Sequence, residues 1–257
     1  MPLQLCVMEK LKNKVAVITG GNSGIGFGIA EAFKNEGAVG VIVGRNQHTL
    51  DSSVSQLGDD FIGINADVTN LTHLERVFKE TSEKFGKIDI IVANAGGGNT
   101  GTVADFSEAD YDQLMSLNLK SVYFTVQKAL PYMNDGASIV LIGSNAAHRA
   151  HASFTLYGAS KAAVIYLAKG FSSDLLDRKI RANVITPGTT DTPAFDKFVP
   201  AEQVEAVKQH FASVMPIGRI GQPSDIGKAA VFLASDDSAF MLGAELLVDG
   251  GMTYLAK

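Results

Sequence analysis

Short runs of apolar residues alternate along the chain with longer segments in which apolar positions recur every three or four residues. The short runs show little polar alternation, which is typical of strands buried on both faces of a parallel sheet. We expect strands at Val15–Thr19, Val39–Val43, Phe61–Asn65, Ile88–Ala93, Ser138–Ile142, Ile180–Ile185 and Glu245–Val248. The longer segments predict helices at Ile25–Asn35, Leu71–Lys84, Tyr111–Tyr132, Leu156–Leu176 and Ser224–Ala234.

Strand followed by helix, repeated along the chain, predicts an α/β fold with a doubly wound, Rossmann-type sheet. We expect seven mostly parallel strands, helices on both faces and a single domain over residues 14–257, preceded by a lead-in over residues 1–13. In this fold, ligands bind beyond the carboxyl ends of the strands. Loops at those ends are therefore the first places to look for chemistry.

Composition removes several classes of protein. Hydrophobic residues make up 46% of the 257 positions, which is too many for a disordered chain. The net charge of −5 argues against nucleic acid as a partner, because a basic surface is needed to meet phosphates. No apolar run approaches the ~18 residues of a membrane span. The start of the chain has no apolar leader, and Met8 is an alternative start to Met1.

The single cysteine, Cys6, cannot form an internal disulfide, which favours a reducing, cytoplasmic location. No activating neighbour accompanies it, so an inert thiol is expected. One segment interrupts the strand and helix rhythm: residues 192–218 contain three prolines and one amphipathic helix near Ala201–Val214. Long loops in compact domains are often functional, and we expect this one to be a substrate lid.

A glycine-rich turn lies between the first strand and the first helix. Gly20, Gly24 and Gly26 follow a G-x-x-x-G-x-G spacing, which is longer than the common G-x-G-x-x-G turn. A helix N-terminus offers free N–H groups to a pyrophosphate. We therefore expect Gly20, Asn22, Ser23, Gly24 and Ile25 to bind a dinucleotide.

The end of the second strand bears on which dinucleotide binds. Gly44 stands where an acidic residue would bind the ribose hydroxyls of NAD, and Arg45 and Asn46 follow it. A guanidinium pairs bidentately with a phosphate, so NADP(H) is favoured. NAD(H) stays an alternative, because an arginine also stacks on adenine without selecting NADP.

Tyr157 and Lys161 are four residues apart and so share one helix face. A nearby ammonium favours the phenolate and is expected to lower the tyrosine pKa from about 10. Ser144 follows the fifth strand. We expect its hydroxyl to hold the substrate oxygen with which Tyr157 exchanges a proton. His148 and His151, in the next loop, lack an evident third ligand, so we expect no metal site. Phe154, Leu156, Phe195, Phe198 and Phe211 indicate an apolar pocket or lid.

Taken together, these motifs resemble the short-chain dehydrogenase/reductase family, over nearly the whole chain from about Lys14 to Met252. Thr19–Gly26 is similar to its T-G-x-x-x-G-x-G turn, and Asn94-Ala95-Gly96 to its N-A-G. Ala93 and Thr190 are small departures from the family pattern. The residues that match its catalytic tetrad are Asn118, Ser144, Tyr157 and Lys161. Those that match its other cofactor contacts are Asp67, Val68, Pro187, Gly188, Thr190 and Thr192.

This resemblance implies hydride exchange at nicotinamide C4 with a carbonyl or secondary alcohol as the partner. Tyr157 would be the general acid or base and Ser144 would orient the substrate oxygen. Lys161 would hold the ribose, and Asn118 would anchor a water that relays protons. The resemblance also implies a homotetramer, with the helices around Tyr111–Tyr132 and Leu156–Leu176 at one interface.

Two alternatives stay open at this point. One is an NAD-dependent alcohol or sugar dehydrogenase of the same family, and the other is a dinucleotide-sensing regulator without catalysis. The chain is also similar to 3-oxoacyl carrier-protein reductases and ketone reductases, but its ending Val248-Asp249-Gly250-Gly251 is shared too widely to choose a substrate.

Overall fold

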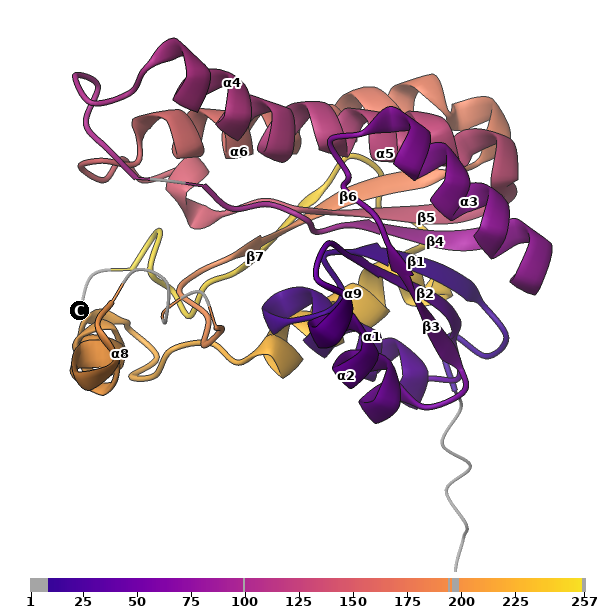
Figure 1. The fold of residues 1–257 in the computed structure, drawn as a ribbon, viewed down its shortest axis with the longest axis horizontal. Helices are drawn as coiled ribbons and strands as arrows, with labels where there is room; N and C mark the ends of the chain where they lie inside the picture. Colours follow the sequence, from indigo (N-terminus) through magenta and orange to yellow (C-terminus); the bar gives the residue numbers. More distant parts are fainter. Residues whose placement is uncertain (1–8, 99, 194, 196–198, 256–257) are drawn as a thin grey trace, which may run out of the picture.

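The computed structural model describes residues 9–98, 100–193, 195 and 199–255. A seven-stranded parallel sheet runs through the molecule in the order β3-β2-β1-β4-β5-β6-β7 (Figure 1). The strands are β1 (Val15–Thr19), β2 (Val39–Gly44), β3 (Phe61–Asn65), β4 (Ile88–Ala93), β5 (Met133–Ile142), β6 (Arg181–Pro187) and β7 (Glu245–Val248). This architecture confirms the doubly wound single-domain fold expected from the hydrophobic pattern.

Helices cover both faces of the sheet (Figure 1). On one face lie α3 (Leu71–Phe85), α4 (Glu108–Met115), α5 (Ser121–Ala129) and α6 (Thr155–Asp174). The other face is covered by α1 (Gly24–Asn35), α2 (Gln47–Leu57) and α9 (Pro223–Ala234). Each face has its own apolar cluster, in which side chains such as Phe78 and Phe33 are completely buried. Burial on both sides explains why the strands read as continuous apolar runs.

The strand order reverses between β1 and β4, which pair with each other although β2 and β3 separate them in sequence. Such a reversal opens a crevice beyond the carboxyl ends of the two strands. Both the glycine turn after β1 and the Asn94 segment after β4 begin at this point. The topology therefore brings two of the expected cofactor segments together.

Some elements differ from the expectation. The helix expected over Tyr111–Tyr132 is divided into α4, a π-helical turn (Ser116–Lys120), α5 and a 3-10 turn (Leu130–Tyr132). β5 begins at Met133, five residues earlier than expected, because Met133 already pairs with Ile88 of β4, before the register of the two strands shifts. α2 was not among the expected helices, since it buries little more than Leu50 and Leu57.

The segment after β6 contains a 3-10 turn (Ala201–Gln203) and α8 (Val204–Val214), close to the expected helix. Phe198 lies outside the described residues, as does Cys6. The described end of the lead-in packs onto the domain: Leu11 is completely buried and its N–H donates to the Glu36 carbonyl at 2.9 Å. Over the described residues, every helix is too short or too polar to cross a membrane.

Candidate active site

The glycine turn places backbone where side chains would not fit. Gly20 and Gly24 have φ values of +63° and +52°, a region that side chains rarely adopt. A Cβ on Gly26 would lie 2.2 Å from the Gly20 carbonyl oxygen, and a Cβ on Gly20 would lie 2.9 Å from the Asn94 amide nitrogen. The turn thus forms a narrow cradle before α1, which suits the close approach of a pyrophosphate.

The cradle is tied to the neighbouring strand by Asn94 and Thr19. The Asn94 side chain donates to the carbonyls of Thr19 and Gly20 at 2.9 and 3.1 Å. The Thr19 hydroxyl in turn accepts the N–H groups of Asn94 and Ala95, both at 3.1 Å. These bonds hold the β1 and β4 ends in one arrangement before any ligand binds, which lowers the entropic cost of binding.

At the opposite side of the crevice, β2 and β3 end beside Arg45, Asn46 and Asp67. Asn46 caps α2 by accepting the Thr49 N–H at 3.1 Å. Burial acts to raise the pKa of the Asp67 carboxyl, but two hydrogen bonds from Thr69, with the Arg45 charge, bring it below its usual range. Val68 is buried beneath them. Within the described part of the chain, no side chain bonds or pairs with the exposed Arg45 guanidinium.

Asn22 bridges these two regions. Its side-chain nitrogen donates to the Thr49 hydroxyl at 2.7 Å, and its carbonyl accepts the Ser53 hydroxyl at 3.0 Å. Gly44 lies directly beneath, because a Cβ there would be 2.6 Å from the Asn22 amide oxygen. Ser23 precedes α1 without capping it through its side chain, and Ile25 packs against the apolar cluster of that face.

Tyr157, Ser144 and Lys161 meet at the carboxyl edge of β4 and β5. The Ser144 side chain lies close enough to the Tyr157 phenol to act on its pKa, which it lowers. The Lys161 ammonium nitrogen lies 5.9 Å from the centre of the Tyr157 ring, as expected for residues one helical turn apart, and donates to the Ile142 carbonyl at 2.9 Å. Lys161 is only 4% exposed, and burial lowers its pKa to about 8.

The expected lowering of the Tyr157 pKa is wrong for the protein as it stands. Burial raises the pKa of the Tyr157 phenol above its usual value, and the Ser144 side chain opposes this only in part. The cause is desolvation, which disfavours the phenolate more than the neighbouring groups favour it. Tyr157 is therefore protonated at neutral pH.

Asn118 lies in the π-helical turn between α4 and α5 and is completely buried. Its side-chain oxygen accepts the Gly97 N–H at 3.0 Å, and its nitrogen donates to the Ser160 hydroxyl at 3.4 Å. A Cβ on Gly96 would lie 3.2 Å from the Asn118 oxygen and 3.3 Å from the Lys161 nitrogen. Single π turns are frequent at functional sites, and this one brings Asn118 beside Lys161.

The segment after β6 closes the remaining side. A Cβ on Gly188, which follows Pro187, would lie 2.8 Å from Asp249, and Thr190 bridges to Gly221. A Cβ on Gly24 would lie 3.1 Å from Thr192, so the expected lid begins against the glycine turn. Lys208 of α8 pairs with Asp191 at 2.6 Å and lies over the Phe195 ring, which also contacts Phe211.

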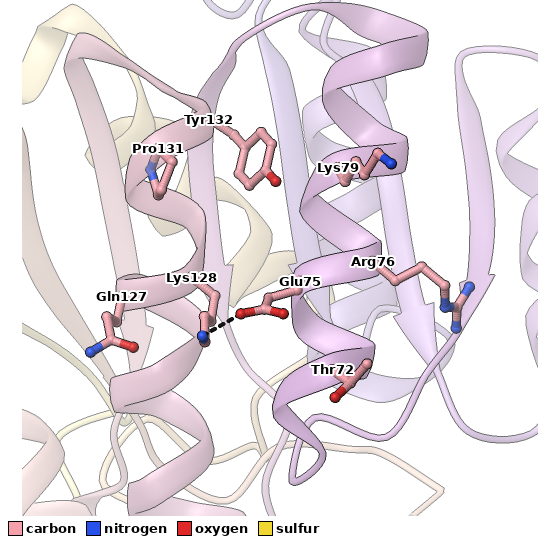
Figure 2. Close-up of a pocket in the computed structure, with 8 residues that line it drawn as sticks. All are labelled: Thr72, Glu75, Arg76, Lys79, Gln127, Lys128, Pro131 and Tyr132. Atoms are coloured by element: carbon pink, nitrogen blue, oxygen red, sulfur yellow. Dashed lines mark hydrogen bonds and ion pairs between the residues drawn. The ribbon is translucent and has the colours of Figure 1, made fainter.

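Two hollows lie away from these groups. One, of about 660 Å³, is an open groove between α3 and α5, lined by residues such as Glu75 and Lys128 (Figure 2). The other, of about 450 Å³, is lined by residues 101–111 and by Leu156 on α6. Neither contains a residue of the expected catalytic tetrad. Within the described ranges, no three His, Cys, Asp or Glu side chains gather as metal ligands would.

A family model described as "Enoyl-(Acyl carrier protein) reductase" matches residues 20–253. An oxidoreductase of Sarocladium schorii, asL5, is 37% identical over 98% of this chain and 100% of its own length. The chain belongs to the short-chain dehydrogenase/reductase family. It is an oxidoreductase of that family, and the doubly wound sheet is the fold that its members share.

Other members of the short-chain dehydrogenase/reductase family are equally complete matches. An NADP-dependent (R)-specific alcohol dehydrogenase of Lentilactobacillus kefiri is 35% identical over 95% of this chain and 98% of its own length. Among solved structures, a short-chain dehydrogenase/reductase of Brucella melitensis has a TM-score of 0.89 at 31% identity, covering 96% of this chain and 99% of its own. One from Serratia marcescens has a TM-score of 0.87 at 30% identity, covering 95% and 99%.

Some residues of this candidate site were not among the expected ones. The Thr19 hydroxyl organises the β1 and β4 ends, and Ser160 joins Asn118 to the Tyr157 carbonyl, which accepts the Ser160 hydroxyl at 2.7 Å. Both lie inside motifs quoted from the sequence, so the signal for them was present. The partners of His148 could not be found in this way, because Glu245 is 97 positions away.

Proposed function

We propose that this chain is an NADP(H)-dependent oxidoreductase that exchanges a hydride between nicotinamide and a carbonyl or secondary alcohol, with Tyr157 as general acid or base. One observation carries the proposal: the Lys161 nitrogen lies 5.9 Å from the Tyr157 ring centre, beside Ser144 and at the sheet edge that carries the glycine cradle. Proton transfer needs a donor held at the substrate oxygen, and this trio supplies one.

The residues present fit a dinucleotide, because glycine at positions 20 and 26 leaves open the cradle that a Cβ at either position would fill. Gly20, Asn22, Ser23, Gly24 and Ile25 would hold the pyrophosphate and adjoining ribose. The adenosine would lie at Arg45, Asn46, Asp67 and Val68, and the nicotinamide half at Asn94, Ala95, Gly96, Tyr157, Lys161, Pro187, Gly188, Thr190 and Thr192. When bound, the cofactor supplies the hydride.

In reduction, Tyr157 would donate its phenolic proton to the substrate oxygen while Ser144 holds that oxygen in place. Because burial raises the Tyr157 pKa, the phenol carries its proton at neutral pH, which favours the reducing direction. Lys161 would hold the ribose hydroxyls, and Asn118 would anchor a water that returns protons toward Lys161.

Two features support NADP(H) over NAD(H). Gly44 leaves no carboxylate to accept ribose hydroxyls, and Arg45 offers an exposed guanidinium to a 2′-phosphate. The Lentilactobacillus kefiri relative is described as NADP-dependent. An NAD-dependent alcohol or sugar dehydrogenase is the second candidate, and a non-catalytic dinucleotide-sensing regulator is the third. The catalytic trio favours an enzyme over the regulator.

We also propose a small-molecule ketone, aldehyde or secondary alcohol as substrate, with the lid over residues 192–218 setting selectivity. Phe195 and Phe211 contact each other there, which supports an apolar lid lining. We propose a cytoplasmic homotetramer that binds neither nucleic acid nor membrane nor a catalytic metal. Exposed tyrosines on α4, α5 and α6 support the oligomer.

The test is Tyr157→Phe, assayed with NADPH against a panel of ketones, oxoacyl thioesters and keto sugars. Removing the acidic proton should lower kcat by about 10²-fold or more, with NADPH affinity kept. Tyr166→Phe is the matched control, because Tyr166 is exposed on the same helix. Near-native turnover in Tyr157→Phe would remove the assigned role, and NADPH binding without turnover of any compound would favour the regulator.

A further inference from the structure

The loop that carries Ser144 is short and internally bonded. Its 3-10 turn (Asn145–Ala147) follows β5, and the Ser144 hydroxyl accepts the Ala146 N–H at 3.2 Å. The Arg149 N–H donates to the Asn145 carbonyl at 3.1 Å. These bonds fix the shape of the turn. They do not fix its position relative to Tyr157, which lies on another element.

On one side the turn rests against α6. A Cβ on Gly158 would lie 2.6 Å from the Ala146 carbonyl oxygen, so helix backbone and loop are in direct contact next to Tyr157. This contact keeps the loop from moving toward the helix. It gives only weak, non-directional attraction against movement away from the helix, because each pair of atoms in van der Waals contact contributes little.

On the other side, three polar side chains form a chain of contacts. The His148 Nε2 lies 2.6 Å from the Glu245 Oε1 at the start of β7. The same carboxylate oxygen accepts the hydroxyl of Thr186, on β6, at 2.5 Å. A Cβ on Gly143 would lie 2.9 Å from that hydroxyl, so the chain of contacts returns to the residue before Ser144.

We infer that Thr186, Glu245 and His148, here named the His148 cluster, are positioning residues that hold the Ser144 loop in place beside Tyr157. The cluster is attached to two neighbouring strands, so the sheet itself sets the place of the loop. A second connection lies beside it, where the Arg149 guanidinium donates to the Met252 carbonyl at 3.1 Å. The inference rests on the proposed function and adds residues that no sequence motif marked.

The cluster contributes geometry more than stability. The His148 and Glu245 side chains are 26% and 22% exposed, and partly exposed pairs of this kind contribute little free energy of folding. Misplacing a catalytic group by about 1 Å can nevertheless lower turnover by about 10²-fold. Loss of the cluster should therefore lower kcat while leaving the fold, and the remote Arg45 end of the cofactor site, intact.

The experiment compares His148→Ala, Glu245→Leu and the double variant, with NADPH and the best ketone of the panel. We expect each single variant to lose about 10-fold or more in kcat, with KM for NADPH and the urea midpoint near those of the wild type. Because the residues act as a unit, the double variant should lose no more than the worse single variant.

His148→Gln and Glu245→Gln keep a donor and an acceptor, and they should retain most of the turnover. His151→Ala is the matched control, since His151 lies in the same loop but contacts the Phe154 ring and not the His148 cluster. This test applies once wild-type turnover has been shown to depend on Tyr157. The inference would then be overturned if His148→Ala kept the wild-type kcat, or if the loss in the double variant equalled the product of the two single losses. If wild-type turnover does not depend on Tyr157, the proposed function fails first, and this inference fails with it.

Discussion

A buried lysine without a carboxylate partner lowers the free energy of unfolding by an amount that depends on pH. Lys161 is 4% exposed, and burial lowers its pKa from 10.5 to about 8. Below pH 8 both folded and unfolded chains carry the charge, and the folded chain bears the full desolvation penalty. Between about pH 8 and 10.5 the folded chain releases its proton and the unfolded chain keeps it, so stability from this group rises with pH.

Lys161→Met removes that dependence. The free energy of unfolding of the wild type relative to the variant should rise by up to about 3 kcal/mol from pH 7 to pH 10.5. The measurement is a series of urea titrations at matched protein concentration. Losing the bond to the Ile142 carbonyl adds a constant cost, so only the slope is diagnostic. Lys169→Met, exposed on the same helix, should keep the wild-type slope, and equal slopes for wild type and Lys161→Met would contradict the argument.

Arg45 presents the second test at the scale of one residue. Arg45→Asp replaces a phosphate partner by a carboxylate that repels the 2′-phosphate and accepts ribose hydroxyls. We expect the ratio of kcat/KM for NADPH to that for NADH to fall by about 10-fold or more, because a charged hydrogen bond contributes about 1.5–3 kcal/mol. Lys79→Asp makes the same charge change on α3 and should leave the ratio alone. An unchanged ratio in Arg45→Asp would show that another residue selects the cofactor.

Individual residues could be predicted where one motif contains all the partners. Tyr157 and Lys161 share a helix turn, so their proximity followed from spacing alone. The protonation of Tyr157 did not follow, because it depends on how much of the phenol the assembled fold removes from water. The His148 cluster was equally hidden, since its three members come from a loop and two strands.

Elements could be predicted where burial sets the pattern. The bounds of β1, β3, β4 and β7 agree with the expected runs, because these strands are mostly apolar and the chain turns polar or glycine-rich where they end. The apolar pattern did not predict α2, because this helix lies at the edge of the sheet and buries few side chains. The division of Tyr111–Tyr132 into α4, a π turn and α5 could not be predicted from the spacing of apolar residues, because one extra residue in a turn barely changes that spacing.

At the scale of the whole molecule, one sheet edge carries both the proposed cofactor segments and the proposed catalytic trio. The segment after β6 is a long connection at that edge, between β6 and α9. Its first residues contact the glycine turn, and its last residues contact the C-terminal Gly250, whose Cβ would lie 2.7 Å from Ile217. Both ends of the proposed lid are therefore anchored on the sheet edge, and we expect the residues between them to set its selectivity.

Helices α4, α5 and α6 cover one face of the sheet (Figure 1) and carry three exposed tyrosines. Tyr111, Tyr123 and Tyr166 are 49%, 44% and 72% exposed. Aromatic side chains are enriched at subunit interfaces. We therefore expect light scattering on the purified protein to give the mass of four copies of 27.2 kDa, about 109 kDa.

Charges placed in this layer should break one interface and leave the other, because a tetramer with D2 symmetry is held by at least two kinds of two-fold contact. Tyr123→Glu combined with Tyr166→Glu should give a dimer of about 54 kDa, twice 27.2 kDa, since burying unpaired carboxylates is costly. His48→Glu, exposed on α2 in the opposite layer, should remain a tetramer. A wild-type mass of one copy would contradict the tetramer, and an unchanged mass in the double variant would move the interface to another face, such as the one bearing the fully exposed Phe240.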